Sequence, residues 1–170
     1  DAIRLFHYCG DLGLPVIFHL DTTFPRHGVP SSRQWWYGGG IENIEEALKL
    51  CPKTQFLGHA PAFWREISGD ADLEPMAYPK DRPIVGRGRL LEFLDKYLNL
   101  NCDLSAGSGL TALSRDLNFT RKFLIDYQDR CFFGRDEFTN GLFDLLVSLN
   151  LPDAVLAKIL SGNALRLVPL

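Results

Sequence analysis

The sequence LPVIFH, residues 14–19, sets the pattern from which the fold is inferred. It is a short apolar run that follows a turn-like Gly-Asp-Leu-Gly segment, as is typical of a buried strand. Three later segments have the same character: QFLGH at 55–59, LNCDLS at 100–105 and CFFGRD at 131–136. None of them alternates cleanly between apolar and polar residues, which indicates strands of a parallel sheet that is covered on both faces.

Helical patterns fill the intervals between these strands. Apolar residues recur at helical spacing in residues 41–51, 89–98, 111–127, 141–149 and 153–160. Alternating strands and helices predict βαβ units and a parallel sheet, so the expected fold class is α/β.

The strand–helix units amount to half of a (β/α)8 TIM barrel, whose sheet closes with eight strands. The chain also begins at Asp1 in the middle of a helical pattern. We therefore expect residues 1–170 to form one partial barrel domain, the C-terminal half with strands five to eight and their helices. An open sheet that is complete in itself is the alternative.

Composition restricts the classes of partner. The 170 residues carry a net charge of -3, with 46% hydrophobic and 23% charged residues, as in an ordinary globular protein. The negative net charge gives no basic surface that would bind nucleic acid, and no apolar run reaches the length of a membrane span. The four cysteines are scattered without a C-x-x-C pair, so we expect buried, reduced thiols in a cytoplasmic protein.

Polar residues stand at the ends of the predicted strands. His19, His59, Ser105 and Asp136 each close one of them, and a barrel would gather these ends at one mouth. Imidazole and carboxylate suit zinc and related divalent ions, which polarise carbonyl groups or activate water. Each residue also has a structural interpretation, because a lone histidine is commonly a hydrogen-bonded core residue and a lone aspartate a helix N-cap.

Two long connections follow predicted strands, at residues 21–40 and 60–88. Long loops at that position in a barrel are usually functional. Guanidinium groups there could bind a substrate carboxylate and indoles an apolar body, or the aromatic residues could simply hold a surface loop in place. The candidate substrate contacts are Ser105 at its strand end and, in the loops, Arg26, Arg33, Trp35, Trp36 and Trp64.

At these residues the sequence resembles a known superfamily. The strand ending in His19 and the segments FLGHAPAFW, NLNCDLSAGSG, RCFFGRDEF and ILSGNALRLVPL are similar to the amidohydrolase superfamily. The resemblance is to the branch of metal-dependent hydrolases and decarboxylases called amidohydrolase 2. It spans almost the whole chain, from strand five to the last helix of the barrel.

The resemblance implies roles for three residues. His19 would be a metal ligand, His59 a second ligand or the acid/base beside the metal, and Asp136 a ligand that orients or deprotonates the attacking water. The sequence departs from the family in two respects. No His-x-His pair of a first strand precedes His19, and Arg135 occupies a position that is often Ser or Thr, where its guanidinium would compete for the carboxylate unless it points away.

The expected function is metal-dependent hydrolysis of an amide, ester or lactone bond in a small molecule, with water activated by a divalent metal, zinc before others. One alternative is metal-dependent, non-oxidative decarboxylation of a small carboxylic acid on the same scaffold, in which His59 would protonate the product carbon. A second alternative is a truncated or decayed barrel without catalysis. The tail and the long loops could also serve as the interface of a homo-oligomer.

Overall fold

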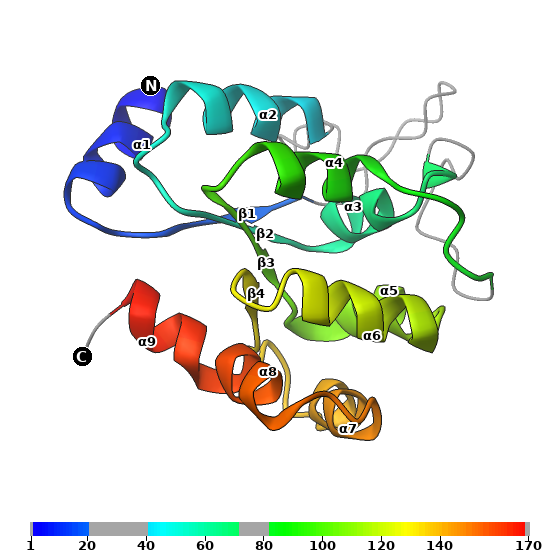
Figure 1. The fold of residues 1–170 in the computed structure, drawn as a ribbon. Coiled ribbons are helices and arrows are strands. Elements are labelled where there is room, and N and C mark those ends of the chain that lie inside the picture. Colours follow the sequence, from blue (N-terminus) through cyan, green and yellow to red (C-terminus); the bar gives the residue numbers. More distant parts are fainter. Residues whose placement is uncertain (1, 21–40, 72–81, 169–170) are drawn as a thin grey trace.

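A computed structural model describes residues 2–20, 41–71 and 82–168, and strands and helices alternate along them (Figure 1). The strands are β1 (Val16–His19), β2 (Phe56–His59), β3 (Leu100–Asp103) and β4 (Cys131–Phe132). The helices are α1 (Ala2–Asp11), α2 (Ile41–Leu50), α3 (Pro61–Trp64), the 3-10 turn η1 (Arg65–Ile67), α4 (Arg89–Lys96), α5 (Ala106–Ser114), α6 (Leu117–Asp126), α7 (Gly141–Ser148), α8 (Asp153–Ala157), the π-helical turn η3 (Lys158–Gly162) and α9 (Asn163–Leu167).

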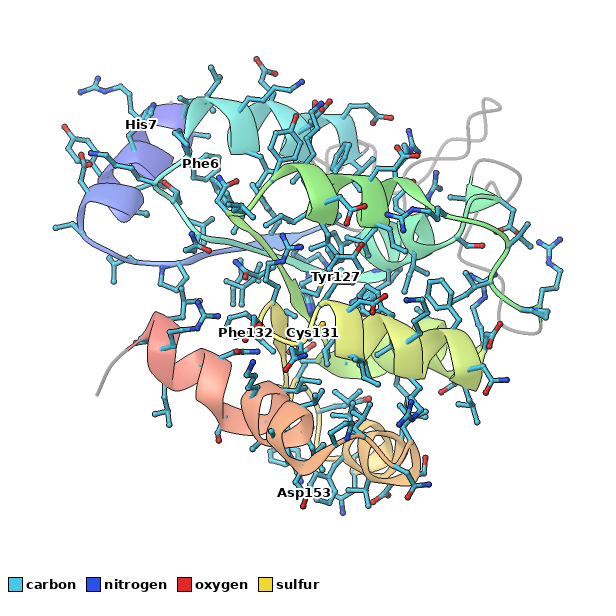
Figure 2. The ribbon with its side chains drawn as sticks, viewed as in Figure 1. Phe6, His7, Tyr127, Cys131, Phe132 and Asp153 are labelled. Atoms are coloured by element: carbon cyan, nitrogen blue, oxygen red, sulfur yellow. The ribbon has the colours of Figure 1, made fainter. Side chains whose placement is uncertain are left out.

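The strands form one parallel sheet in the order β1-β2-β3-β4. This arrangement confirms the predicted α/β class, and neighbouring strands follow each other in sequence as they do in a β/α barrel. Figure 1 shows the helices arranged around the sheet from α1 at the β1 side to α8 and α9 beyond β4. Figure 2 labels Cys131 and Phe132 on the edge strand β4 and, on α1, His7 and Phe6, whose ring contacts Phe18 of the other edge strand, β1.

Alternate strand residues face opposite sides of the sheet. In β1, Val16 and Phe18 pack against the core, whereas Ile17 is 61% exposed. The ring of Phe18 stacks on that of Phe56 at 4.9 Å, and Phe6 of α1 meets both rings edge to face. The sequence predicted strands covered on both faces. The structure instead leaves one face of β1 open among the described residues, because the helices cover only the other face.

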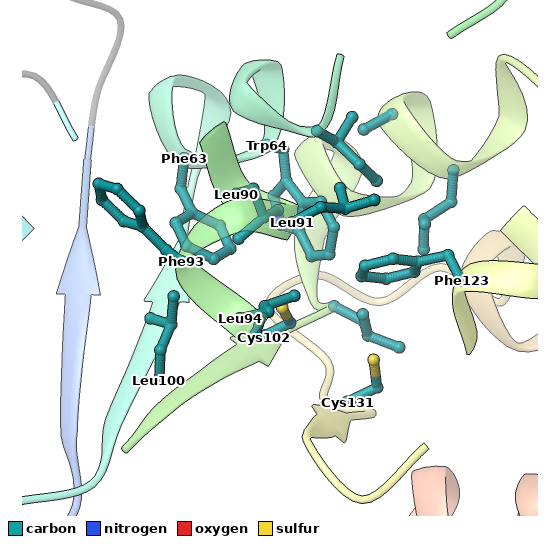
Figure 3. Packing of buried hydrophobic residues seen from close by; sticks show 14 of the residues in the cluster. Phe63, Trp64, Leu90, Leu91, Phe93, Leu94, Leu100, Cys102, Phe123 and Cys131 are labelled. Atoms are coloured by element: carbon teal, nitrogen blue, oxygen red, sulfur yellow. The ribbon is translucent and has the colours of Figure 1, made fainter. Parts of the chain in front are cut away.

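The hydrophobic core lies between the sheet and the helices. Figure 3 shows Leu100 and Cys102 of β3 and Cys131 of β4 facing side chains of the helices. All four cysteines are free thiols, as predicted: three are buried and Cys9 is half-buried. No helix in the described ranges is long and apolar enough to cross a membrane.

The fourth strand is shorter than the predicted 131–136. It ends at Phe132, because the amide of Phe133 donates to the carbonyl oxygen of Ile159 in the π-helical turn, 2.9 Å away. The buried Asn163 side chain donates to the carbonyl oxygens of Gln128 and Cys131 at 2.7 and 2.8 Å. The tail thus binds both ends of β4. The predicted helix 153–160 is α8 and the start of the π-helical turn, and α9 follows beyond the predicted range.

The predicted helix 111–127 is also two helices, α5 and α6. The carboxylate of Asp116 accepts a hydrogen bond from the amide of Phe119 at 3.0 Å and so begins a new helix. An aspartate side chain competes for backbone amides in this way, which ends one helix and caps the next.

Asp116→Ala should therefore lower the free energy of unfolding by about 1 kcal/mol, the usual contribution of an N-cap. Urea unfolding followed by circular dichroism measures it. Asp116→Asn is the matched control, because asparagine caps about as well as aspartate. Equal losses in the two variants would contradict the capping role.

The packing of α5 against the end of β3 supplies a second test. A Cβ at Gly109 would overlap the carbonyl group of Leu104, whereas one at Gly107 would meet nothing closer than a Glu137 carboxylate oxygen at 3.8 Å. Gly109→Ala should destabilise the protein by about 1–3 kcal/mol, as overpacking does, and Gly107→Ala in the same helix should not. Thermal unfolding of both variants checks this, and equal melting temperatures would contradict it.

Candidate active site

An open pocket of about 600 Å³ lies on the side of the sheet away from the core. This volume is within the range of small-molecule sites. The strand residues that point away from the core line this pocket. Its floor is therefore apolar, and its polar groups lie at the carboxyl ends of the strands. The apolar lining includes Ile17, Leu57 and Phe132, and the polar lining includes His19, His59, Asp103, Ser105, Arg135 and Asp136.

Parallel pairing brings the predicted strand-end residues together. His19 and His59 are register partners on β1 and β2, and their rings lie 5.3 Å apart. Asp136 reaches the same pocket from the loop after β4, and its Oδ2 lies 3.9 Å from Nε2 of His59. The three residues therefore converge on one pocket, while their roles as ligands or catalysts remain predictions.

The structure adds one residue that the sequence reasoning missed. Asp103, at the end of β3, places its Oδ2 3.1 Å from Nδ1 of His59. Ser105 donates to the same carboxylate twice, from its amide to Oδ1 at 2.9 Å and from its hydroxyl to Oδ2 at 3.0 Å. The available signal was a carboxylate inside the apolar segment LNCDLS, two residues before the predicted strand-end Ser105.

These contacts oppose the effect of burial on both ionisable groups. The hydrogen bond to Asp103 raises the pKa of His59 against the lowering effect of burial, and the negative charges of Asp103 and Asp136 add to the rise. Burial alone would raise the pKa of Asp103, but hydrogen bonds from His59 and Ser105 outweigh it and lower that pKa. The two shifts agree in favouring imidazolium beside carboxylate.

Asp136 is the most exposed member of the site. Its side chain is 62% exposed, and it lies in the loop beyond the short β4 instead of at a strand end as predicted. Within the described part of the chain, no ion pair joins it to Arg135, so the anticipated competition for its carboxylate does not occur there. Asp136 also does not cap α7, whose N-cap position is Asn140.

Two alanines after the strands have backbones in the left-handed region. Ala60 follows His59 with a φ of 80°, and Ala106 follows Ser105 with a φ of 65°. This region disfavours any residue with a Cβ, and such outliers cluster at functional sites. Each of these alanines comes directly after a polar residue that contacts Asp103, His59 in one case and Ser105 in the other.

The predicted substrate contacts have different outcomes. Trp64 is fully buried in the core (Figure 3), where it donates its indole N–H to the carbonyl oxygen of Asp103 at 3.1 Å. Ser105 lines the pocket, and its hydroxyl proton is used by Asp103. The remaining candidates, Arg26, Arg33, Trp35 and Trp36, lie outside the described residues.

The fit of these residues to a divalent metal is incomplete. Two ligand atoms of a tetrahedral zinc ion, each about 2.0–2.2 Å from it, lie about 3.4 Å apart. Nε2 of His59 and Oδ2 of Asp136 are 3.9 Å apart, which is wider than this spacing. In addition, no group of three His, Cys, Asp or Glu side chains in the described ranges is arranged to hold a metal ion.

No protein-family model matches the sequence, and no curated protein matches it either.

Several solved decarboxylases are similar in structure. A 2,6-dihydroxybenzoate decarboxylase from Rhizobium shares 15% identity at a TM-score of 0.49, covering 97% of this chain and 54% of that one. A 5-carboxyvanillate decarboxylase from Sphingomonas paucimobilis shares 17% identity at a TM-score of 0.49, and the match covers 96% of this chain and 51% of that one. A dihydroxybenzoic acid decarboxylase from a Polaromonas species, with bound manganese and 2-nitroresorcinol, shares 16% identity at a TM-score of 0.47, and the match covers 97% of this chain and 52% of that one. The chain spans about half the length of the solved structures that it matches.

The His59–Asp103 pair should make stability depend on pH. The pKa of His59 in the folded state lies above the ordinary 6.5, so His59 stabilises the fold. This stabilisation is fully present below pH 6.5 and is lost as the pH rises through the raised pKa. The pKa of Asp103 is lowered in the folded state, so Asp103 also stabilises the fold. This stabilisation is present above the ordinary pKa of 3.8 and is lost as the pH falls through the folded-state pKa. Asp103→Asn should therefore reduce the free energy of unfolding most between about pH 4 and 6.5, and less in alkali.

Urea unfolding of both proteins across this range checks the prediction. Asp136→Asn is the control, because the charge of Asp136 is the smallest of the influences that raise the pKa of His59. Its effect on stability should vary less with pH. A loss in Asp103→Asn that is the same at all pH values would show that the pair is not ionised in the way described.

Proposed function

We propose that this chain is the C-terminal half of a (β/α)8-barrel enzyme of the amidohydrolase type. Its pocket would catalyse the non-oxidative decarboxylation of a small carboxylic acid. The observation that carries the proposal is the setting of His59, whose Nδ1 contacts the Asp103 carboxylate while Nε2 is turned toward Asp136 at the mouth of the pocket.

This setting suits the delivery of a single proton. When His59 is an imidazolium, the proton on Nδ1 is held by Asp103 and the proton on Nε2 is available to a bound molecule. In decarboxylation, the bond between the substrate carbon and its carboxylate breaks and carbon dioxide leaves. The electron pair of that bond forms a new C–H bond with the proton from Nε2, and His59 then recovers a proton from solvent.

The lining of the pocket suits the rest of such a substrate. Ile17, Leu57 and Phe132 offer an apolar floor to a hydrocarbon body. Arg135 lines the pocket next to Asp136, and a guanidinium is a good partner for a carboxylate. The substrate class that follows is a small carboxylic acid with an apolar or aromatic body.

Decarboxylation uses the residues of the described site more fully than hydrolysis does. Hydrolysis needs a base that accepts a proton from the attacking water, whereas the contact with Asp103 favours the protonated form of His59, which is a proton donor. Nε2 of His59 also cannot bind a cation and carry the transferable proton at the same time. The solved structures reported above are named for decarboxylation, but the proposal is carried by the arrangement around His59. A divalent cation, zinc included, stays a prediction that metal analysis of the protein and of His19→Ala would test.

The test is release of carbon dioxide from a panel of aromatic and aliphatic carboxylic acids. His59→Gln should lose at least about 100-fold in rate, the usual contribution of a general acid. His7→Gln is the matched control, because His7 is exposed on α1. In heavy water, the product should carry deuterium at the carbon that lost the carboxylate.

Two other outcomes would overturn the proposal. Turnover of amides, esters or lactones without release of carbon dioxide would establish the hydrolase. No turnover of either class by this chain would favour the non-catalytic alternative.

A further inference from the structure

We propose that Asp103 is a positioning residue that holds a proton on Nδ1 of His59 and thereby leaves Nε2 as the ring nitrogen that faces the pocket. The inference rests on the proposed function in one respect, that His59 acts on a bound molecule. The protonated nitrogen itself can be observed without any turnover.

The hydrogen bonds around Asp103 require this assignment. A carboxylate can only accept hydrogen bonds, so the proton in the 3.1 Å contact between Oδ2 and Nδ1 belongs to the histidine. The other oxygen, Oδ1, accepts the amide of Ser105 at 2.9 Å. Both carboxylate oxygens are thus engaged, and the plane of the carboxylate is held from two sides.

Ser105 does not compete for the histidine nitrogen. Its Oγ lies 3.4 Å from Nδ1 and 3.0 Å from Oδ2 of Asp103. A serine hydroxyl has one proton, and the shorter contact to the charged oxygen takes it. That proton is therefore not available to Nδ1. The hydroxyl donates to the Asp103 carboxylate and not to His59.

The core holds Asp103 in place. The buried indole of Trp64 donates to its carbonyl oxygen at 3.1 Å, and the amide of Leu104 donates to the carbonyl oxygen of Phe132 at 3.0 Å. These bonds fix the backbone on both sides of the side chain, since Trp64 comes from α3 and Phe132 from β4. The carboxylate is therefore presented by rigid structure, as a positioning group requires.

Asp136 cannot perform the same function from the other side of the ring. Its Oδ2 lies 3.9 Å from Nε2, beyond hydrogen-bond distance, and its side chain is mostly exposed. Among the described residues, Nδ1 is therefore the nitrogen of His59 that a carboxylate holds at hydrogen-bond distance, and Nε2 is directed toward the pocket.

Nitrogen NMR of protein labelled with ¹⁵N-histidine tests the inference, in a buffer alkaline enough to make His59 neutral. We expect the wild-type His59 signals to show a protonated Nδ1 and an unprotonated Nε2. In Asp103→Ala the acceptor is gone, so the protonated fraction of Nδ1 should fall; Asp103→Asn serves as a second variant of nearly the same size. Asp136→Asn and Ser105→Ala should keep the wild-type pattern, because the Asp103 carboxylate is still present.

Three results would overturn the inference: a wild-type His59 protonated on Nε2, an unchanged pattern in both Asp103 variants, or an equal change in Asp136→Asn. A parallel rate measurement separates it from the proposed function. If carbon dioxide is released, Asp103→Asn should reduce kcat by about 10–100-fold, as loss of a group that orients a histidine does, with a smaller effect on KM. The expected NMR pattern without carbon dioxide release would leave the inference standing and remove the proposed function.

Discussion

Parallel pairing of the strands is the constraint on which the site depends. Because β1 to β4 run in one direction, their carboxyl ends meet at one edge of the sheet. The pairing register then places His19 beside His59, and alternation along each strand decides which side chains face the pocket. Residues that are far apart in the sequence become neighbours without any direct connection between them.

The half-buried carboxylate of Asp103 is stable there because its acceptors are satisfied. An isolated charge in a low-polarity setting is strongly unfavourable, and here His59 and two groups of Ser105 surround it. The left-handed backbone of Ala106 follows directly after this cluster. Local strain and a dense group of hydrogen bonds thus occur together at the pocket, as they do at many functional sites.

Local patterns were sufficient to predict the strands and most helices, because a buried strand and an amphipathic helix each have their own periodicity. They failed where a hydrogen bond outside the local apolar pattern takes a backbone amide. Asp116 divides a continuous apolar pattern into two helices, and the π-helical turn at Ile159 takes the amide of Phe133 and shortens β4. Neither contact has a signature in the spacing of apolar residues.

The candidate site shows the same division. His19, His59 and Asp136 could be singled out because polar residues that end apolar segments are conspicuous in a sequence. Trp64 was equally conspicuous, yet its indole is in the core and supports Asp103 from behind. Its position relative to the pocket depends on the path of α3 after β2, which no local pattern specifies.

The sequence by itself determined the α/β class, the order of strands and helices and the polar residues at the mouth of the pocket, since these follow from periodicity and chain direction. Only the tertiary structure decided that Asp103 is the partner of His59 and that Nδ1 is the nitrogen it contacts. The physical reason is that a hydrogen bond depends on distances of a few tenths of an ångström. The distance between His59 and Asp103 depends on the register in which β2 and β3 pair and on the conformations of the two side chains, which only the folded structure fixes.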